Sequence, residues 1–169
     1  IGEICRKAAR RIYEGDEKMI RVTGTNLEDF LGKPKYRPEK KNKKNEVGIV
    51  RGLAWTSVGG VTLEIEVNLM PGKGSVVLTG KLGDVMKESA QTGISYIRSI
   101  SEDYHIDPEF FQKHDIHIHV PEGAVPKDGP SAGITMATAI LSAVTGKPVR
   151  ADVAMTGEIT LRGRVLPIG

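Results

Sequence analysis

The chain has 169 residues, of which 39% are hydrophobic, 27% are charged and 5% are aromatic, and its formal net charge is +3. A chain of this length buries about 70% of the surface that its unfolded form exposes, so it can build a core without disulfides or a structural metal. The single cysteine, Cys5, excludes an internal disulfide, and the sequence contains no Cys/His zinc pattern, membrane-length apolar stretch or signal segment. We therefore expect a soluble cytoplasmic protein without a metal site.

The first quarter of the sequence predicts a small helical piece. Apolar residues recur at spacings of three and four over residues 1–14, opposite basic side chains, which indicates an amphipathic helix. A short apolar strand is expected at residues 19–22. Thr25–Glu28 has the capping-box pattern that starts a second helix, which ends near Gly32. This piece is too small to fold alone, so its apolar stripe needs a partner surface.

Residues 33–46 are predicted to form a basic linker. The first 46 residues carry 13 Lys or Arg against 8 Asp or Glu, and much of this excess lies in Lys40–Lys44. Such a run could contact nucleic acid or a membrane surface. Pro34 and Pro38 and the scarcity of aromatic residues favour a solvated linker. We expect neither a membrane partner nor a nucleic-acid partner through this segment.

After the linker, strand and helix patterns are mixed. Val47–Trp55 and Val61–Leu69 are predicted to pair as a hairpin, and the polar–apolar alternation of the second strand indicates one buried and one solvent-facing side. Apolar periodicity predicts helices at Asp84–Tyr104 and Ser131–Val144. Further strands are expected at residues 76–79, 115–120 and 151–155 and in a hairpin at 158–165. Because the elements follow no strict βαβ repeat, the predicted fold class is α+β (mixed α/β).

The densest candidate for chemistry is Pro126–Gly133, where Ser131 lies between Gly129 and Gly133 at a predicted helix start. Glycine neighbours let a substrate backbone approach, and the N–H groups of a helix start can bind a developing oxyanion. A serine before an apolar run is also the commonest helix N-cap, and the spacing alone favours the cap. The Gly-x-Ser-x-Gly pattern fits an α/β-hydrolase elbow, but all four histidines precede Ser131, which excludes the residue order of that fold.

A nucleophilic serine needs a base, and the sequence leaves two kinds open. His117 and His119 alternate along a predicted strand and share a face, so they could assist a serine or bind a metal. A hydrogen-bonded pair without a metal is the more usual outcome. A lysine could act instead if burial or a positive neighbour lowered its pKa, but Lys127 lies on a Pro/Gly loop where solvation is expected. No Walker A loop occurs, so the chain itself should bind no nucleotide.

Two long blocks, in the right order, resemble the signature blocks of the Lon ATP-dependent protease family, and three shorter stretches match as well. The signature blocks are Val120–Gly133 and Thr156–Gly169, and the supporting stretches are Gly52–Gly60, Leu78–Ala90 and Asp115–His119. The resemblance implies a serine-lysine peptidase domain of bacterial Lon type at residues 47–169, with a hairpin-rich sheet and packed helices. Residues 1–32 resemble the end of the small helical subdomain of an AAA+ ATPase module, and residues 33–46 remain the linker.

The activity implied by this resemblance is that of an ATP-dependent serine endopeptidase. Such enzymes degrade unfolded, damaged or short-lived proteins as hexameric rings under an ATP-driven unfoldase. Ser131 would be the nucleophile, and a lysine would accept its proton and return it to the leaving amine.

The resemblance also implies supporting roles, for each of which a structural hydrogen bond is the alternative. Thr156 would orient the lysine, Asp128 would shape the loop beside Ser131, and Glu158, His117 and His119 would support the site. Trp55 could line a substrate groove, although a single tryptophan is more often part of a core.

The catalytic lysine of the family lies a few residues beyond the Gly-Gly that follows Leu-Pro-Ile, whereas the sequence stops at Gly169. We therefore expect a fragment of a longer protein, with an incomplete dyad and no peptidase activity of its own. The resemblance implies no cofactor in this chain, and it places ATP and Mg²⁺ in the ATPase module of the parent protein.

Two other functions are compatible with parts of the sequence. A non-catalytic Lon-like module would only build a ring, and its expected mark, loss of the serine block, is not seen in this sequence. A nucleic-acid-binding module would depend on Lys40–Lys44, and its affinity would fall steeply with salt.

Overall fold

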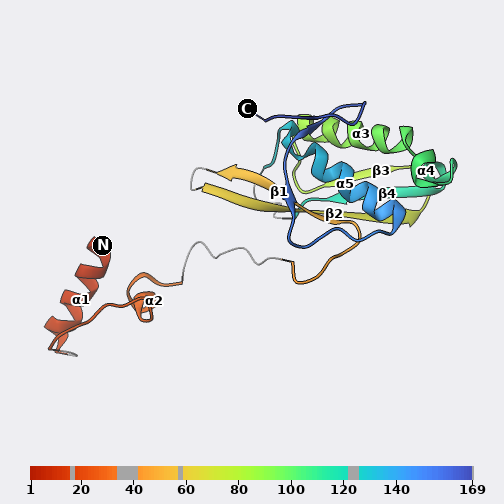
Figure 1. Cartoon of the computed structure of the whole chain (residues 1–169). Coiled ribbons are helices and arrows are strands. Elements are labelled where there is room, and N and C mark those ends of the chain that lie inside the picture. The colour runs from red at the N-terminus through yellow and green to blue at the C-terminus, as the bar shows by residue number, and fades with distance from the viewer. Residues whose placement is uncertain (16–17, 34–41, 57–58, 122–125, 169) are drawn as a thin grey trace. The chain divides into compact units, whose positions relative to one another are not determined.

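The computed structural model describes residues 1–15, 18–33, 42–56, 59–121 and 126–168. These residues belong to two compact units, Ile1–Glu39 and Lys40–Gly169. Figure 1 labels the helices and strands of both units.

The first unit contains the two predicted helices, α1 (Gly2–Glu14) and α2 (Leu27–Leu31). They pack around Phe30, and the guanidinium carbon of Arg11 lies 4.8 Å from the centre of its ring. No other residue in the described part of this unit is buried. The apolar side of α1 is thus left without a core of its own.

Two details of this unit differ from the prediction. The strand expected at residues 19–22 is wrong, since no strand is present there and a lone short strand has no partner to pair with. The capping box is not formed either, because Asn26 occupies the N-cap of α2. The Asn26 Oδ1 atom accepts the N–H of Thr23 at 2.7 Å instead of an N–H group of α2.

The second unit contains a five-stranded mixed sheet with the order β3-β4-β2-β1-β5. Antiparallel pairs join β1 to β2 and β2 to β4, whereas β3–β4 and β1–β5 are parallel. The predicted hairpin is confirmed, with residues 57–58 of its turn outside the described residues. The strands are β1 (Ile49–Thr56), β2 (Gly59–Pro71), β3 (Val76–Thr79), β4 (His114–His119) and β5 (Ala154–Met155).

Helices and a small second sheet complete this unit. The predicted helix Asp84–Tyr104 is divided into α3 (Asp84–Ser99) and a 3-10 helix, η1 (Glu102–Tyr104), because the α-helical pattern ends at Ile100. A short helix that the sequence did not predict, α4 (Phe110–Lys113), leads into β4. The remaining elements are the 3-10 helix η2 (Pro130–Ala132), α5 (Gly133–Thr145) and a hairpin of β6 (Glu158–Ile159) and β7 (Val165–Leu166).

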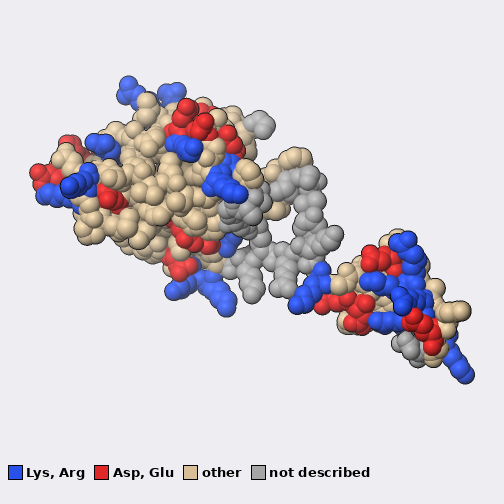
Figure 2. Space-filling view, turned by 180° about the vertical axis from the view of Figure 1, so that it is seen from behind, with Lys and Arg blue, Asp and Glu red and all other residues tan. Residues whose placement is uncertain are grey.

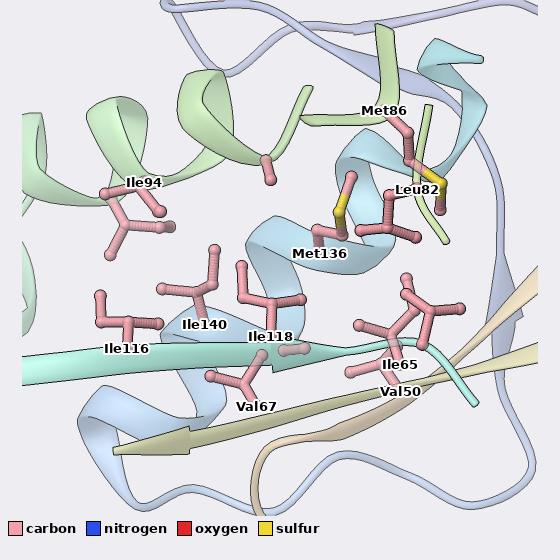
Figure 3. Packing of buried hydrophobic residues seen from close by; sticks show 14 of the residues in the cluster. Val50, Ile65, Val67, Leu82, Met86, Ile94, Ile116, Ile118, Met136 and Ile140 are labelled. Carbon is pink, nitrogen blue, oxygen red and sulfur yellow. The ribbon is translucent and has the colours of Figure 1, made fainter. Parts of the chain in front are cut away.

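The core lies between one face of the sheet and two helices. α5 packs on β1 and β2, and α3 packs on α5 (Figure 1). Figure 3 shows Ile94 of α3 facing Ile140 of α5, which lies between Ile116 and Ile118 of β4. We call this side of the sheet the covered face and the opposite side the open face. This arrangement confirms the predicted α+β class.

The end of the predicted linker is attached to the second unit. Asn42 Oδ1 accepts two hydrogen bonds from the guanidinium of Arg51, at 2.6 and 3.0 Å, and Asn45 Oδ1 accepts the N–H of Ala151 at 3.0 Å. The linker residues 34–41 lie outside the described residues. Of the helices in the described ranges, none combines the length and the hydropathy needed to cross a bilayer.

Candidate functional site

Ser131 lies in η2, directly before the first residue of α5, and is half-buried. The N-cap interpretation of this serine is wrong, because Ala132 holds the N-cap position of α5 and no side chain caps it. Among the described residues, the Ser131 hydroxyl has no hydrogen-bond partner. Gly129, which precedes η2, has a φ of 114°, a backbone conformation that favours glycine over residues with a side chain. The hydroxyl is therefore left available for chemistry.

The segment before Ser131 is fastened to the start of α3. Asp128 Oδ1 accepts the N–H of Met86 at 3.0 Å and that of Gly129 at 2.8 Å. The N-cap of α3 is Gly83, which has no side chain to satisfy the first N–H groups, so Asp128 supplies a capping carboxylate from another segment. A Cβ on Gly83 would lie 2.2 Å from the Asp128 carboxyl carbon. Asp128 thus joins the loop before Ser131 to the first turn of α3.

The segment after β5 holds the other side of Ser131. The N–H of Gly157 donates to the carbonyl oxygen of Ser131 at 2.7 Å, and Thr156 Oγ1 donates to the same oxygen at 3.3 Å. The N–H of Ile134 donates in return to the Gly157 carbonyl at 3.1 Å. Thr156 therefore contacts the backbone of Ser131 directly. Glu158 follows as the half-buried first residue of β6.

Gly133 allows α3, α5 and β6 to meet closely behind Ser131. A Cβ at this position would lie 2.7 Å from Ser89 Oγ and 2.8 Å from the backbone nitrogen of Ile159. Both distances are shorter than a carbon atom tolerates, so the glycine is required by packing. Ser89 itself donates to the carbonyl oxygen of Pro130 at 3.3 Å. The sequence interpretation missed Ser89, for which the available signal was a polar residue on the apolar side of α3.

The two strand histidines lie on the open face. Their neighbours Ile116 and Ile118 face the helices in the core, and residues alternate between the two sides of a strand. His117 Nε2 and His119 Nδ1 lie 2.9 and 2.7 Å from the Oγ1 atom of Thr79, so they form the expected hydrogen-bonded pair.

The structure does not bring these histidines to Ser131, which precedes a helix of the covered face. A serine assisted by this pair therefore finds no support in the geometry. Within the described ranges, no three His, Cys, Asp or Glu side chains are grouped so that they could hold a metal ion.

Trp55 lies near the end of β1 and is 82% exposed, so its interpretation as a core residue is wrong. β5 pairs only with Arg51 and Gly52 of β1, and Thr156 follows β5 directly. In the described strands, the edge of β1 from Leu53 onward therefore has no partner on that side. This edge begins beside the segment that holds Ser131 and leads toward the exposed ring of Trp55.

Charge on the second unit is scattered. The face seen in Figure 2 carries small groups of Lys or Arg and of Asp or Glu around a broad area without charged residues. Hydrogen bonds from the N–H groups of Ser75 and Lys73 lower the pKa of Asp115, at the start of β4. This carboxylate holds the turn between β2 and β3 and lies on the same side of the strand as the two histidines.

Comparisons with known proteins agree on one family. The model of the Lon protease (S16) C-terminal proteolytic domain matches residues 21–169. The Lon protease of Lachnoclostridium phytofermentans is 73% identical over 150 residues, which are 89% of this chain and 18% of that protein. Lon protease 1 of Bacillus subtilis is 63% identical over 169 residues, 100% of this chain and 22% of that protein. The chain thus spans about a fifth of the length of these curated relatives.

Proposed function

Because the chain belongs to the family of Lon protease (S16) C-terminal proteolytic domains, we propose that it is the serine-peptidase part of a longer ATP-dependent endopeptidase. One observation carries the proposal. The backbone on both sides of Ser131 is held by hydrogen bonds at the start of α5, while in the described residues its hydroxyl is bonded to nothing. A nucleophile needs this combination of a fixed backbone and a free reacting atom.

The reaction that fits this arrangement is acyl transfer through Ser131. The hydroxyl oxygen attacks a peptide carbonyl while an amine base accepts its proton, and N–H groups at the start of α5 hold the tetrahedral oxyanion. The base then protonates the leaving amine as the peptide bond breaks. Water hydrolyses the resulting ester, which releases the acid product and restores the hydroxyl.

The amine in this proposal belongs to a lysine supplied from outside residues 1–169, with Thr156 orienting it. β7 pairs with β6, and β6 follows Thr156 and Gly157 directly. Figure 1 shows the last part of the chain at the same end of the second unit as the starts of α3 and α5. A segment continuing from this end would start close to Ser131.

The proposed substrate is an extended polypeptide lying along the free edge of β1. An unpaired strand edge offers main-chain hydrogen bonds to any sequence, which suits an enzyme that cuts many unfolded or damaged proteins. Trp55 would line this groove, and the edge would guide the peptide to Ser131. Glu158 would support the site through β6, and the histidine pair of the open face takes no part in the reaction.

The remaining parts of the proposal concern the parent protein. We assign ATP and Mg²⁺ to an AAA+ module that precedes this chain, and cytoplasmic hexameric rings to the assembled enzyme. Unfolded, damaged or short-lived proteins are its proposed substrates, and the short length of this chain relative to the Lon relatives is consistent with such a larger enzyme.

The test uses the full-length parent protein with ATP and an unfolded protein such as casein. We expect Ser131→Ala to lower cleavage by at least about 10³-fold. Ser95→Ala, which removes an exposed hydroxyl from α3, is the matched control and should cut at the wild-type rate. Unchanged cleavage by Ser131→Ala would contradict the proposal, and absence of cleavage by the wild type would favour the non-catalytic ring module.

A further inference from the structure

Three polar side chains are buried in the described part of the chain. They are Ser89 on α3 and Thr135 and Ser142 on α5, with 7%, 0% and 5% of their surface exposed. Each hydroxyl donates to a carbonyl oxygen outside its own helix. By contrast, Thr92 and Thr145 donate to carbonyls four residues earlier in their own helices.

A buried hydroxyl is costly unless it is hydrogen-bonded, so the acceptors of these three groups must be held in place. Two of the acceptors belong to the segments that hold Ser131. Ser89 Oγ donates to the carbonyl of Pro130 at 3.3 Å, and Thr135 Oγ1 donates to the carbonyl of Met155 at 3.2 Å. The third acceptor, the carbonyl of Lys147, lies beyond the opposite end of α5.

Ser89 acts on the peptide plane that precedes the nucleophile. Because a peptide unit is planar, fixing the carbonyl of Pro130 also fixes the direction of the N–H of Ser131. The N–H of Gly133 donates to the same carbonyl, so the Ser89 hydroxyl adds a second hydrogen bond from a different element. The contact joins α3 to the start of α5 immediately before Ser131.

Thr135 holds the segment that bonds to the peptide plane after Ser131. Met155 directly precedes Thr156, and Thr156 and Gly157 both donate to the carbonyl of Ser131. A Cβ on Gly52 would lie 3.3 Å from Thr135 Oγ1, so this hydroxyl is packed closely against β1. Thr135 therefore holds the carbonyl directly before residues 156–157, and these two residues donate to the Ser131 carbonyl.

We propose that Ser89 and Thr135 are positioning residues that set the orientation of Ser131 for attack, an inference that rests on the proposed function. Neither hydroxyl donates to Ser131 itself. Ser89 donates to the carbonyl of Pro130, directly before Ser131, and Thr135 donates to the carbonyl of Met155, directly before the two residues that donate to the Ser131 carbonyl. Loss of either hydroxyl allows one of the two peptide planes at Ser131 to rotate. Small misplacements of a reacting group are costly, and we expect kcat to fall about tenfold with little change in KM.

The experiment compares four variants of the full-length parent protein. Ser89→Ala and Thr135→Val remove one hydroxyl each, and Thr135→Val keeps the side-chain volume. Thr135→Ser keeps the hydroxyl and loses the methyl group. Ser142→Ala is the matched control, because it removes an equally buried hydroxyl at the far end of α5 and also leaves the N–H of Gly48 without its acceptor. The measurements are kcat and KM on a fluorogenic peptide, the rate at which a fluorophosphonate modifies Ser131, and Tm.

Under this proposal, the changes in activity across the four variants do not follow the changes in Tm. Ser89→Ala and Thr135→Val lose about tenfold in kcat and in the rate of Ser131 modification, whereas Thr135→Ser and Ser142→Ala keep both within about twofold despite a lower Tm. Activities that follow Tm across all four variants would overturn the inference, and so would wild-type modification rates in Ser89→Ala and Thr135→Val. The proposed function fails separately, if the wild-type protein is not modified at Ser131.

Discussion

The two faces of the sheet carry the two groups of side chains that invite a catalytic interpretation, and they differ in what they are connected to. The covered face leads through buried aliphatic residues to α3 and α5, which hold Ser131 (Figure 3). The open face carries His117 and His119, which bond to Thr79 on the neighbouring strand. Nearness in the sequence therefore does not bring the histidines and Ser131 into one site. Alternation along β4 places the histidines on the side of the sheet opposite to α5, which Ser131 precedes.

The largest expected difference between the two faces is in stability. Ile118 is fully buried on the covered face, so Ile118→Ala should lower the free energy of unfolding of the 169-residue chain by about 2–5 kcal/mol. His119→Ala, one position along the same strand on the open face, should cost less than about 1.5 kcal/mol, because it removes one hydrogen bond. Urea unfolding followed by circular dichroism measures both values. Equal losses would show that the open face also belongs to the core.

A second prediction concerns the close packing behind Ser131. Gly133→Ala places a methyl group against Ser89 and Ile159, so we expect a loss of about 1–3 kcal/mol. Gly93→Ala is the control, since a Cβ there would meet Ala137 at an ordinary 3.5 Å and alanine favours the helix by about 0.5–1 kcal/mol. The unfolding free energies of the two variants should therefore shift in opposite directions. A neutral Gly133→Ala would mean that Ser89 and Ile159 leave room for a methyl group at this position.

The third prediction concerns the effect of open-face side chains on peptide cleavage. His117→Gln and His119→Gln should change peptide cleavage by the full-length parent less than about twofold, because both histidines bond to Thr79 on the side of the sheet opposite to α5. The pH profile of kcat should also keep its inflections in both variants. A loss above about 100-fold would restore histidine as the base for Ser131.

The smallest expected effect is at Asp115. Hydrogen bonds from Ser75 and Lys73 lower its pKa in the folded protein, so its contribution to stability is present above the unfolded pKa of about 3.9 and is lost as the pH falls below it. Asp115→Asn should therefore be less stable than the wild type at pH 6, and the difference should shrink between pH 4 and pH 2. Thermal unfolding across this range measures the difference, and a gap that widens on acidification would contradict the assignment.

Most of the fold followed from local patterns. Alternation along residues 61–69 and the apolar stripe after Asp84 predicted the central hairpin and α3. The strand expected at residues 19–22 failed because strand formation needs a pairing partner, which composition does not reveal. The N-cap interpretation of Ser131 failed for a related reason, since its backbone is held by Thr156 and Gly157, which lie far along the sequence.

The residues that support the candidate site were harder to predict than Ser131. The block around Ser131 was recognisable from its own residues, whereas Ser89 and Thr135 looked like ordinary members of helices. What distinguishes them is visible only in the fold, where their hydroxyls donate to the carbonyls of Pro130 and Met155 in other segments. Contacts of this kind depend on how helices pack, which one sequence does not specify.

The most direct test of Ser131 as the nucleophile is to map where a fluorophosphonate attaches to the full-length parent protein. Peptide mass spectrometry should find one adduct per chain, on Ser131, at an equal rate in the wild type and in the His117→Gln/His119→Gln double variant. An adduct on a different residue, or cleavage of casein that continues after Ser131 is fully modified, would contradict the account.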